Sequence, residues 1–159
     1  MRVGLGYDVH RLIFGRELML GGVRIPSEKG ALGHSDADVL IHAVCDALLG
    51  AAALGDIGVY FPDDDPQYEG MAGLKLLALT RKILDNKSFK VYNVDAVIML
   101  EKPKVAPYIN MMRVNIAKVL DIPVENISVK ATTTEGLGFI GEGKGIAAQA
   151  VVTIKEISK

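Results

Sequence analysis

A nearly continuous apolar stretch constrains this sequence more than any other feature. Residues 39–50 read VLIHAVCDALLG, which places apolar side chains on most sides of a helix. The preceding Ser35 and Asp38 have the S-x-x-D form of a capping box, so we expect the helix to begin near Asp36 and to end at about Gly50. A helix that is apolar nearly all round is expected to be buried, with the rest of the chain arranged around it.

Three polar residues interrupt this helix at intervals of four positions. Asp38, His42 and Asp46 therefore share one helix face. A polar side chain inside a core is costly unless it has a partner, so we expect a metal ion or a charged substrate beside His42. Cys45 lies between them and is either a further metal ligand or, in the simpler interpretation, a small buried residue.

Length and charge exclude several classes of protein. A chain of 159 residues fits one domain, which we expect to span residues 1–159. The formal net charge of −1 and the lack of a basic run argue against nucleic acid and against membranes as partners. No apolar run is long enough to span a bilayer, and there is no signal-peptide pattern. A single cysteine excludes an internal disulfide and suits a reducing compartment, so we expect a cytoplasmic protein.

The apolar content is higher than usual. Counted with the 17 glycines and without the 5 tyrosines, apolar residues make up roughly 58% of the chain, against about 45–50% in ordinary globular domains. One interpretation is a tightly packed, glycine-rich domain. The other is that part of the surface is buried against further subunits, because monomers rarely expose large apolar patches.

Periodicity and turn residues predict the remaining elements. The expected strands and the one expected hairpin cover residues 2–9, 18–25, 89–100, 127–134 and 147–154. The other expected helices cover residues 74–84 and 107–120. The expected loops cover residues 11–16, 27–33 and 61–66. Because strands and helices do not alternate strictly, this order favours an α+β fold with a single sheet and helices packed on one face.

Two residues of the first strand complete a candidate metal site. Asp8 and His10 are two positions apart, so on a strand they point to the same side. With His42 they give three ligands and one open position, a set typical of catalytic zinc. The alternative is that His10 lies at the surface and that His42 is a hydrogen-bonded core histidine.

Two further segments carry groups that suit phosphate. His34 and Ser35 precede the central helix, whose free N–H groups attract anions, although Ser35 also serves as an ordinary cap. Residues 132–135, Thr-Thr-Thr-Glu, offer hydroxyls and a carboxylate for phosphate and Mg²⁺, although threonine is also a common strand residue. The glycine-rich segment 136–145 either approaches a ligand or a symmetry axis closely or joins two strands.

Four segments together resemble the 2-C-methyl-D-erythritol 2,4-cyclodiphosphate synthase family of the non-mevalonate isoprenoid pathway. They are GYDVHR at 6–11, the stretch 34–58, FPDDDP at 61–66 and VKATTTEGLGF at 129–139. The likeness extends from residue 1 to about residue 154. It implies an α+β subunit, a homotrimer with its sheets around the threefold axis, and active sites between neighbouring subunits. The implied reaction, that of a phosphorus–oxygen lyase, cyclises 4-diphosphocytidyl-2-C-methyl-D-erythritol 2-phosphate and releases CMP.

The same resemblance implies a role for individual residues. Asp8, His10 and His42 match zinc ligands, and Glu135 matches the ligand of a second ion, Mg²⁺ or Mn²⁺. His34 and Thr133 match catalytic groups at the phosphates. Asp46 matches a carboxylate that supports the zinc site without binding the ion. The residues that match substrate-binding positions are Asp8, His10, His34, Ser35, Asp56, Ile57, Gly58, Phe61, Asp63, Asp65, Leu100, Pro103, Lys104, Ala106, Thr132, Thr133, Thr134, Glu135, Phe139 and Glu142.

One pair of residues departs from the family pattern. Relatives commonly carry Arg and Glu where this chain has Glu142 and Lys144, so the two charges are exchanged. In parts of the family this region lines a cavity on the threefold axis that accepts isoprenoid diphosphates. Glu142 would repel such a ligand and Lys144 would attract it, which weakens the expectation of feedback binding and leaves catalysis unaffected.

Two other functions fit the bare residues. The first is a metal-dependent phosphohydrolase, in which water attacks phosphorus. The second is a trimeric binding protein with structural zinc. Structural zinc sites normally have four protein ligands, and only three can be named here.

Overall fold

Five strands form a central mixed sheet in a computed structural model that describes residues 1–157. The spatial order is β4-β1-β7-β5-β6, and β5 and β6 are parallel whereas the other neighbours are antiparallel. The strands of this sheet are β1 (Arg2–Phe14), β4 (Lys29–Ala31), β5 (Phe89–Met99), β6 (Ile127–Thr132) and β7 (Gly145–Glu156). The short strands β2 (Leu18–Leu20) and β3 (Val23–Ile25) form a separate hairpin, so the expected single sheet is accompanied by a second, two-stranded one.

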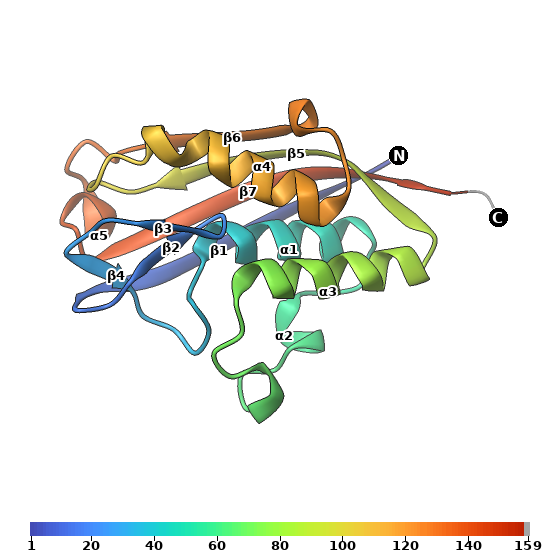
Figure 1. Cartoon of the computed structure of the whole chain (residues 1–159), viewed down its shortest axis with the longest axis horizontal. Helices are drawn as coiled ribbons and strands as arrows, with labels where there is room; N and C mark the ends of the chain where they lie inside the picture. Colours follow the sequence, from blue (N-terminus) through green and yellow to red (C-terminus); the bar gives the residue numbers. More distant parts are fainter. Residues whose placement is uncertain (158–159) are drawn as a thin grey trace.

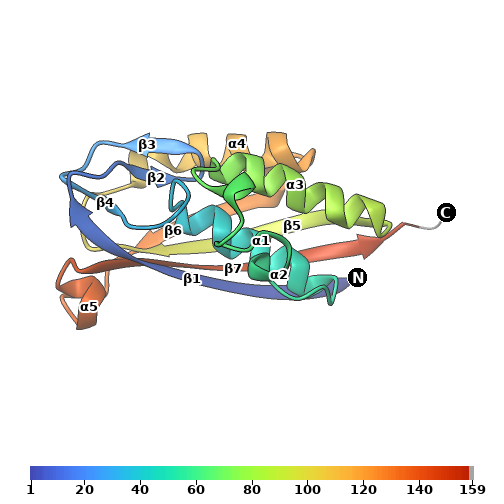
Figure 2. The same ribbon diagram turned by 90° about the horizontal axis from the view of Figure 1, so that it is seen from below.

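The long helices cover one face of the sheet (Figures 1 and 2). They are α1 (Val39–Ala51), α3 (Gly73–Asn86) and α4 (Ile109–Leu120). The short helical segments are α2 (Ile57–Tyr60), α5 (Gly138–Gly141) and the 3₁₀ turns η1 (Pro66–Tyr68), η2 (Ala106–Tyr108) and η3 (Val124–Asn126). Among residues 1–157, no helix has the length and apolar character needed to cross a bilayer.

Two glycines bring α1 directly onto β1. A Cβ at Gly4 would lie 1.9 Å from the Ala47 carbonyl oxygen, and a Cβ at Gly6 would lie 1.9 Å from the Ala43 carbonyl oxygen. Because no side chain separates the two backbones, the helix lies on the strand at the closest approach that packing permits. This contact fixes the distance between the residues that follow Gly6 on β1 and the first turns of α1.

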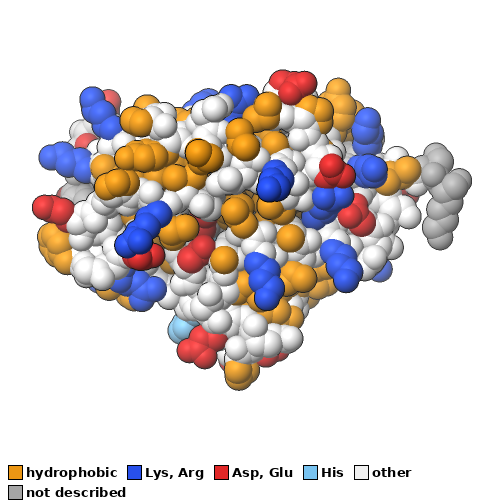
Figure 3. All heavy atoms as spheres, in the orientation of Figure 1, with side chains coloured by type: hydrophobic (Ala, Val, Ile, Leu, Met, Phe, Trp, Pro, Cys, Tyr) orange, Lys and Arg blue, Asp and Glu red, His pale blue; other side chains and the backbone are white. Residues whose placement is uncertain are grey.

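The opposite face of the sheet carries apolar side chains without a helix over them. Val3, Leu5, Tyr7 and Val9 alternate along β1 and are between 43% and 67% exposed. Figure 2 shows the three long helices on the other side of the sheet, and only the short α5 on this one. The helical face differs in composition, because charged side chains are scattered among the apolar ones there (Figure 3).

Two boundaries differ from the expectation, and one short strand, β4, was not expected. β1 continues to Phe14, because its end pairs with β4 inside the segments 11–16 and 27–33 that were expected to be loops. The central helix begins at Val39 rather than near Asp36. Its N-cap is Asp38, whose carboxylate accepts the Ile41 N–H at 3.1 Å.

Ser35 is therefore not the cap of the helix. Its hydroxyl oxygen accepts the Ala37 N–H at 3.1 Å and forms a local turn before the helix begins. The remaining predicted helices and strands, including the hairpin over residues 18–25, are confirmed to within a few residues at each end.

Candidate active site

Three side chains from β1 and α1 direct their donor atoms at one point. Asp8 Oδ2 lies 2.9 Å from His10 Nε2 and 3.0 Å from His42 Nδ1, and the two nitrogens are 3.3 Å apart. Asp8 and His10 are on the helix side of β1, two positions apart. His42 lies next to Ala43, which contacts Gly6, so the glycine contact determines where this histidine meets the strand.

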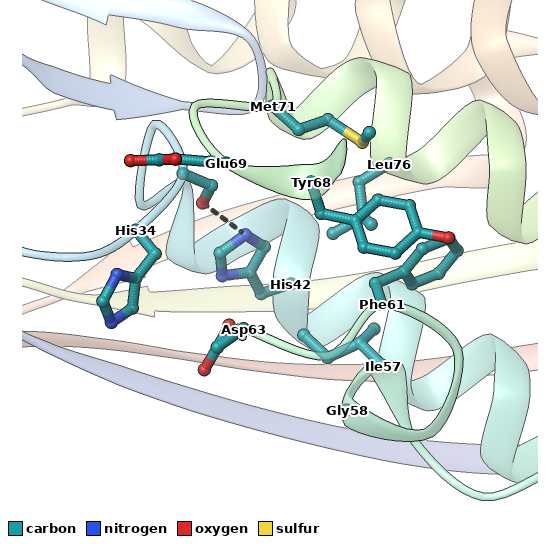
Figure 4. A pocket seen from close by; sticks show the side chains of 11 residues that line it. His34, His42, Ile57, Gly58, Phe61, Asp63, Tyr68, Glu69, Met71 and Leu76 are labelled. Atoms are coloured by element: carbon teal, nitrogen blue, oxygen red, sulfur yellow. Dashed lines mark hydrogen bonds between the residues drawn. The ribbon is translucent and has the colours of Figure 1, made fainter. Parts of the chain in front are cut away.

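The outer nitrogen of each histidine has its own partner. His10 Nδ1 lies 3.0 Å from the Leu32 carbonyl oxygen, and His42 Nε2 lies 3.3 Å from the Ser35 hydroxyl (Figure 4). A ring N–H donated to these oxygens allows the inner nitrogen of each ring to exchange its hydrogen bond with Asp8 for a bond to a metal ion. Histidines that bind metals in proteins usually have such an outer partner, which fixes the tautomer and the ring orientation.

The environment of the site shifts the pKa of Asp8 and that of His42 in opposite directions. Burial alone would raise the pKa of Asp8, but hydrogen bonds and the charges of His10 and His42 lower it to about 2. Burial alone would lower the pKa of His42, and the hydrogen bond and charge of Asp8 raise it overall. The carboxylate is therefore ionised at neutral pH and ready to bind a cation.

The spacing of the donor atoms fits a tetrahedral metal ion. Zn–N bonds of ~2.0–2.1 Å imply neighbouring ligand atoms roughly 3.3–3.4 Å apart, close to the 2.9–3.3 Å observed. Among the described residues, Asp8, His10 and His42 form the group that can hold a metal ion, and Cys45 is not part of it. Burial raises the pKa of the Cys45 thiol to about 12, which supports the simpler interpretation of this residue.

The other two polar residues of the helix have backbone partners rather than ligands. Asp38 accepts the N–H groups of Gly21 and Gly22 at 3.0 and 2.8 Å, so it fastens the β2–β3 turn to the start of α1. Asp46 accepts the Ile57 N–H at 2.8 Å and fixes the start of α2. The metal ion or charged substrate expected along this face concerns His42 alone.

A pocket of about 130 Å³ opens beside His42 (Figure 4). Seven predicted site residues line it, namely His34, Ser35, His42, Ile57, Gly58, Phe61 and Asp63. Its remaining lining residues were not predicted, and they are Tyr68, Glu69, Met71 and Leu76. Figure 4 shows His34 and His42 on one side and the rings of Phe61 and Tyr68 on the other, with ring centroids 5.3 Å apart.

Two predicted carboxylates are absent from the lining of this pocket. Asp56 accepts the Val59 N–H at 3.2 Å, and Asp65 accepts the Gln67 N–H at 3.0 Å. Each one caps the short helical segment that follows it.

A second group of predicted residues lines a different hollow. Leu100, Pro103, Lys104 and Glu142 are part of the lining of a hollow of about 880 Å³, and Ala106 is not. Thr132 ends β6, and Thr133, Thr134 and Glu135 continue the chain beyond it. Glu101, which was not predicted, accepts the N–H groups of Thr134 and Gly136 at 3.2 Å each and so shapes this turn.

A third hollow lies on the far side of His10. It has a volume of about 550 Å³, and its lining includes His10, Lys29, Phe139 and Lys144. Lys144 also pairs with Glu142 at 2.5 Å. Within one chain the predicted site residues are therefore divided between separate hollows.

A model of the YgbB family matches residues 1–155. The chain belongs to the YgbB family. It is 61% identical over 154 residues to the 2-C-methyl-D-erythritol 2,4-cyclodiphosphate synthase of Alkaliphilus metalliredigens (strain QYMF), and the match covers 97% of each chain.

Two solved structures resemble this YgbB-family chain closely. The bifunctional IspDF from Campylobacter jejuni has a TM-score of 0.94 and 41% identity, over 99% of this chain and 42% of that one. A 2C-methyl-D-erythritol-2,4-cyclodiphosphate synthase in its CDP-bound form has a TM-score of 0.89 and 37% identity, over 97% of this chain and 100% of that one. The resemblance stated from the sequence and the α+β fold are confirmed.

Most of the residues that sequence reasoning missed in this YgbB-family site lie outside the long helices and strands, and Leu76, on α3, is the exception. Tyr68, Glu69 and Met71 lie in or near irregular loop, where no periodicity predicts the direction of a side chain. Glu101 follows a strand directly and acts on backbone N–H groups 33 and 35 residues away. No local signal identifies such partners, because the contact depends on the parallel pairing of β5 and β6.

Proposed function

We propose that this YgbB-family chain converts 4-diphosphocytidyl-2-C-methyl-D-erythritol 2-phosphate to 2-C-methyl-D-erythritol 2,4-cyclodiphosphate and CMP. The observation that carries the proposal is the convergence of Asp8, His10 and His42 beside a pocket that also contains His34 and Ser35. The family relative named above and the fold neighbour with bound CDP support the same assignment.

The reaction requires positioning more than a protein nucleophile. An oxygen of the 2-phosphate attacks the β-phosphorus of the same molecule, the bond from that phosphorus to the CMP oxygen breaks, and CMP leaves. Correct orientation of such an intramolecular attack is worth roughly 7–11 kcal/mol. Both reacting groups are anionic, so cationic and hydrogen-bonding groups must reduce their repulsion.

Asp8, His10 and His42 would hold a divalent ion, which we take to be Zn²⁺. When bound, such an ion supplies Lewis-acid polarisation of phosphate oxygens. Glu135 would hold a second ion, Mg²⁺ or Mn²⁺, whose preference is for oxygen ligands. In this proposal His34, Ser35 and Thr133 donate hydrogen bonds to phosphate oxygens.

The substrate is oriented from both of its ends. We assign the erythritol part to Ile57, Gly58 and the loop Phe61–Asp65. Asp46 holds the Ile57 N–H and thereby positions that wall of the pocket. We assign the cytidine part to Leu100–Ala106 with Thr132–Thr134. Binding of this remote group anchors the leaving CMP.

The proposal includes a homotrimer with shared active sites. His42 and the proposed cytidine residues line separate hollows of one chain, which favours a site completed by a neighbouring subunit. Val3, Leu5, Tyr7 and Val9 offer an apolar sheet face of the kind that oligomers cover.

Three further assignments belong to this proposal. The reaction class is that of a phosphorus–oxygen lyase. Residues 1–159 act as one domain. The single buried cysteine is consistent with a reducing compartment, and we assign the enzyme to the cytoplasm.

The decisive experiment is mass spectrometry of the product formed in ¹⁸O-labelled water. Cyclisation retains every non-CMP atom of the substrate and incorporates no label. A phosphohydrolase whose water attacks the β-phosphorus would instead give an open-chain product with one ¹⁸O atom in its new terminal phosphate. Tight substrate binding without CMP release in the presence of Zn²⁺ and Mg²⁺ would favour the binding-protein alternative.

The metal requirement is tested separately by exhaustive chelation, checked by metal analysis. We expect turnover to disappear and to return when Zn²⁺ and Mg²⁺ are added together. Full turnover by the metal-free protein would exclude the proposed mechanism.

A further inference from the structure

One irregular segment, Leu32–Asp38, supports both histidines of the metal site. Its Leu32 carbonyl oxygen lies 3.0 Å from His10 Nδ1, and its Ser35 hydroxyl lies 3.3 Å from His42 Nε2. The two histidines come from different elements, a strand and a helix. Their ring orientations therefore depend jointly on the position of this segment, which we call the support loop.

The support loop has no regular structure of its own to hold it. Ala37 has a φ of 53°, in the left-handed region that is unfavourable for a residue with a Cβ. A backbone of this kind persists only where the surroundings hold it in place. The question is which contacts do so.

Asp38 fastens the end of the support loop to the β2–β3 turn, and Asp36 attaches the middle of the loop to α3. Asp36 Oδ2 accepts the Gly73 N–H at 2.8 Å, and Asp36 Oδ1 accepts the Asp38 N–H at 3.2 Å. One carboxylate thus joins the loop to the first turn of α3 and also closes the turn that leads into α1. A backbone bond from the Gly70 N–H to the His34 carbonyl oxygen, at 2.9 Å, lies beside this attachment.

The start of α3 is built to receive this carboxylate. Ala72, its N-cap residue, has no side chain that can accept a hydrogen bond, so the Gly73 N–H depends on a partner from elsewhere. Gly73 is buried, and a Cβ there would lie 3.0 Å from Asp38 Cβ and 3.3 Å from Asp36 Oδ1. Because Gly73 has no side chain, the Asp36 carboxylate can approach the Gly73 N–H closely.

We propose that Asp36 is a positioning residue for the metal site and the phosphate side of the pocket. It is not a ligand, because the group that can hold a metal among the described residues is Asp8, His10 and His42. It acts through the support loop, which carries His34 and Ser35 and orients both metal-binding rings. The inference rests on the proposed function, since it concerns the ion and substrate of that site.

The test compares Zn²⁺ affinity and the spectrum of the Co²⁺-loaded protein in three variants and the wild type. For Asp36→Ala we expect Zn²⁺ affinity, measured by competition with a chelator, to fall at least about tenfold, as when outer partners of metal ligands are removed. The visible absorption bands of bound Co²⁺ should shift or weaken. Asp36→Asn keeps one acceptor for the Gly73 N–H and should lie between Asp36→Ala and the wild type.

Arg81→Met is the matched control. Arg81 lies further along the same helix, where it donates to the Val119 carbonyl and to Asp121 at 3.1 Å each, so its loss destabilises α3 away from Gly73. We expect this variant to bind Zn²⁺ with wild-type affinity and to give the wild-type Co²⁺ spectrum. An equal loss of affinity in Arg81→Met would overturn the inference, because it would reflect general weakening of α3.

Wild-type affinity and an unchanged Co²⁺ spectrum in Asp36→Ala would also overturn it, while leaving the proposed function intact. If Asp36→Ala does not fold, Asp36→Asn decides in the same way, with a loss of at least about threefold expected. Failure of the wild-type protein itself to bind Zn²⁺ would reject the proposed function, and this inference with it.

Discussion

His42 is a buried, ionisable residue on a helix that is otherwise mostly apolar. It is 7% exposed, and its neighbours Ile41 and Ala43 are fully buried. Such a position is tolerated because both ring nitrogens have partners, Asp8 on one side and Ser35 on the other. A histidine held in this way is the residue on which the metal site most depends.

We expect His42→Ala to abolish Zn²⁺ binding and turnover while the chain remains folded. Alanine is a favourable helix residue, and the apolar contacts of α1 with β1 remain, whereas Asp8 and His10 alone cannot complete the set of three ligands. Metal analysis, CMP release and circular dichroism measure the three properties. CMP release at nearly the wild-type rate by the metal-free variant would contradict the assignment.

His34→Ala is the companion variant. His34 is exposed and lines the pocket without belonging to the metal group. We expect it to retain Zn²⁺ and to lose most of its turnover. Loss of Zn²⁺ in this variant would mean that the two histidines do not have separate roles.

The Cys45 thiol is expected to be unreactive in the folded protein. Burial raises its pKa to about 12, so almost no thiolate forms at pH 8. Alkylation by iodoacetamide should therefore be at least 100-fold slower in buffer than in about 6 M guanidinium, where the thiol has an ordinary pKa and is accessible. Rapid alkylation of the native protein would contradict the burial of Cys45. Protection from alkylation only in the presence of Zn²⁺ would instead support the alternative that Cys45 is a metal ligand.

At the scale of the elements, the contact between β1 and α1 determines the geometry of the site. Gly6→Ala should destabilise the protein by about 3 kcal/mol or more, at the upper end for overpacking, because the added Cβ meets backbone rather than a flexible side chain. Zn²⁺ affinity should fall as well, since α1 carries His42 away from the strand. Urea unfolding and chelator competition measure the two effects.

Gly50→Ala is the control for Gly6→Ala. Gly50 is exposed near the end of α1, where an added Cβ would have ordinary van der Waals contact with the Leu5 carbonyl oxygen at 3.9 Å. We expect no loss of stability and a gain of up to about 1 kcal/mol from helix propensity. Equal effects of the two substitutions would show that the close approach at Gly6 is unimportant.

The sequence predicts the helices and strands whose apolar residues form a regular pattern or a continuous run. The apolar positions of residues 74–84 and 107–120 identify α3 and α4, and β5 and β7 stand out as runs of apolar residues. Short elements held only by backbone pairing have no such signal. β4 has three residues, Lys29–Ala31, and becomes a strand because it pairs with the end of β1.

The candidate site divides in the same way. The alternation of a strand puts Asp8 and His10 on one side, so their proximity can be predicted from the sequence. The partners of Asp36 and Asp38 cannot be predicted in this way. Asp36 accepts an N–H group 37 residues later in the chain, and Asp38 accepts two that are 16 and 17 residues earlier. Spacing on the helix places Asp38 on the same face as His42, but it does not identify its partner, which is the turn of a neighbouring hairpin.

For the whole molecule, the exposed sheet face is where oligomerisation is tested. Leu5 is 61% exposed on this face, so Leu5→Asp would be harmless in a monomer. In the proposed trimer it would bury three unpaired charges, and we expect dissociation into monomers that retain Zn²⁺ and lose turnover. Light scattering after size-exclusion chromatography, metal analysis and CMP release measure these outcomes.

Met111→Asp serves as the comparison for Leu5→Asp. Met111 is 57% exposed, but it lies on α4, on the opposite side of the sheet. We expect this variant to keep the mass and the turnover of the wild type. Dissociation caused by Met111→Asp, or an unchanged mass for Leu5→Asp, would place the subunit contact elsewhere.

The hydrogen bonds among Asp8, His10 and His42 have a consequence for how an ion enters. Their donor atoms lie 2.9–3.3 Å from one another, and bonds to Leu32 and Ser35 of the same chain hold the two rings from behind. The conformational entropy of gathering the ligands is therefore lost when the chain folds and not when the ion arrives. Loading should consequently be limited by diffusion and by shedding of water from the ion, with little rearrangement of the protein.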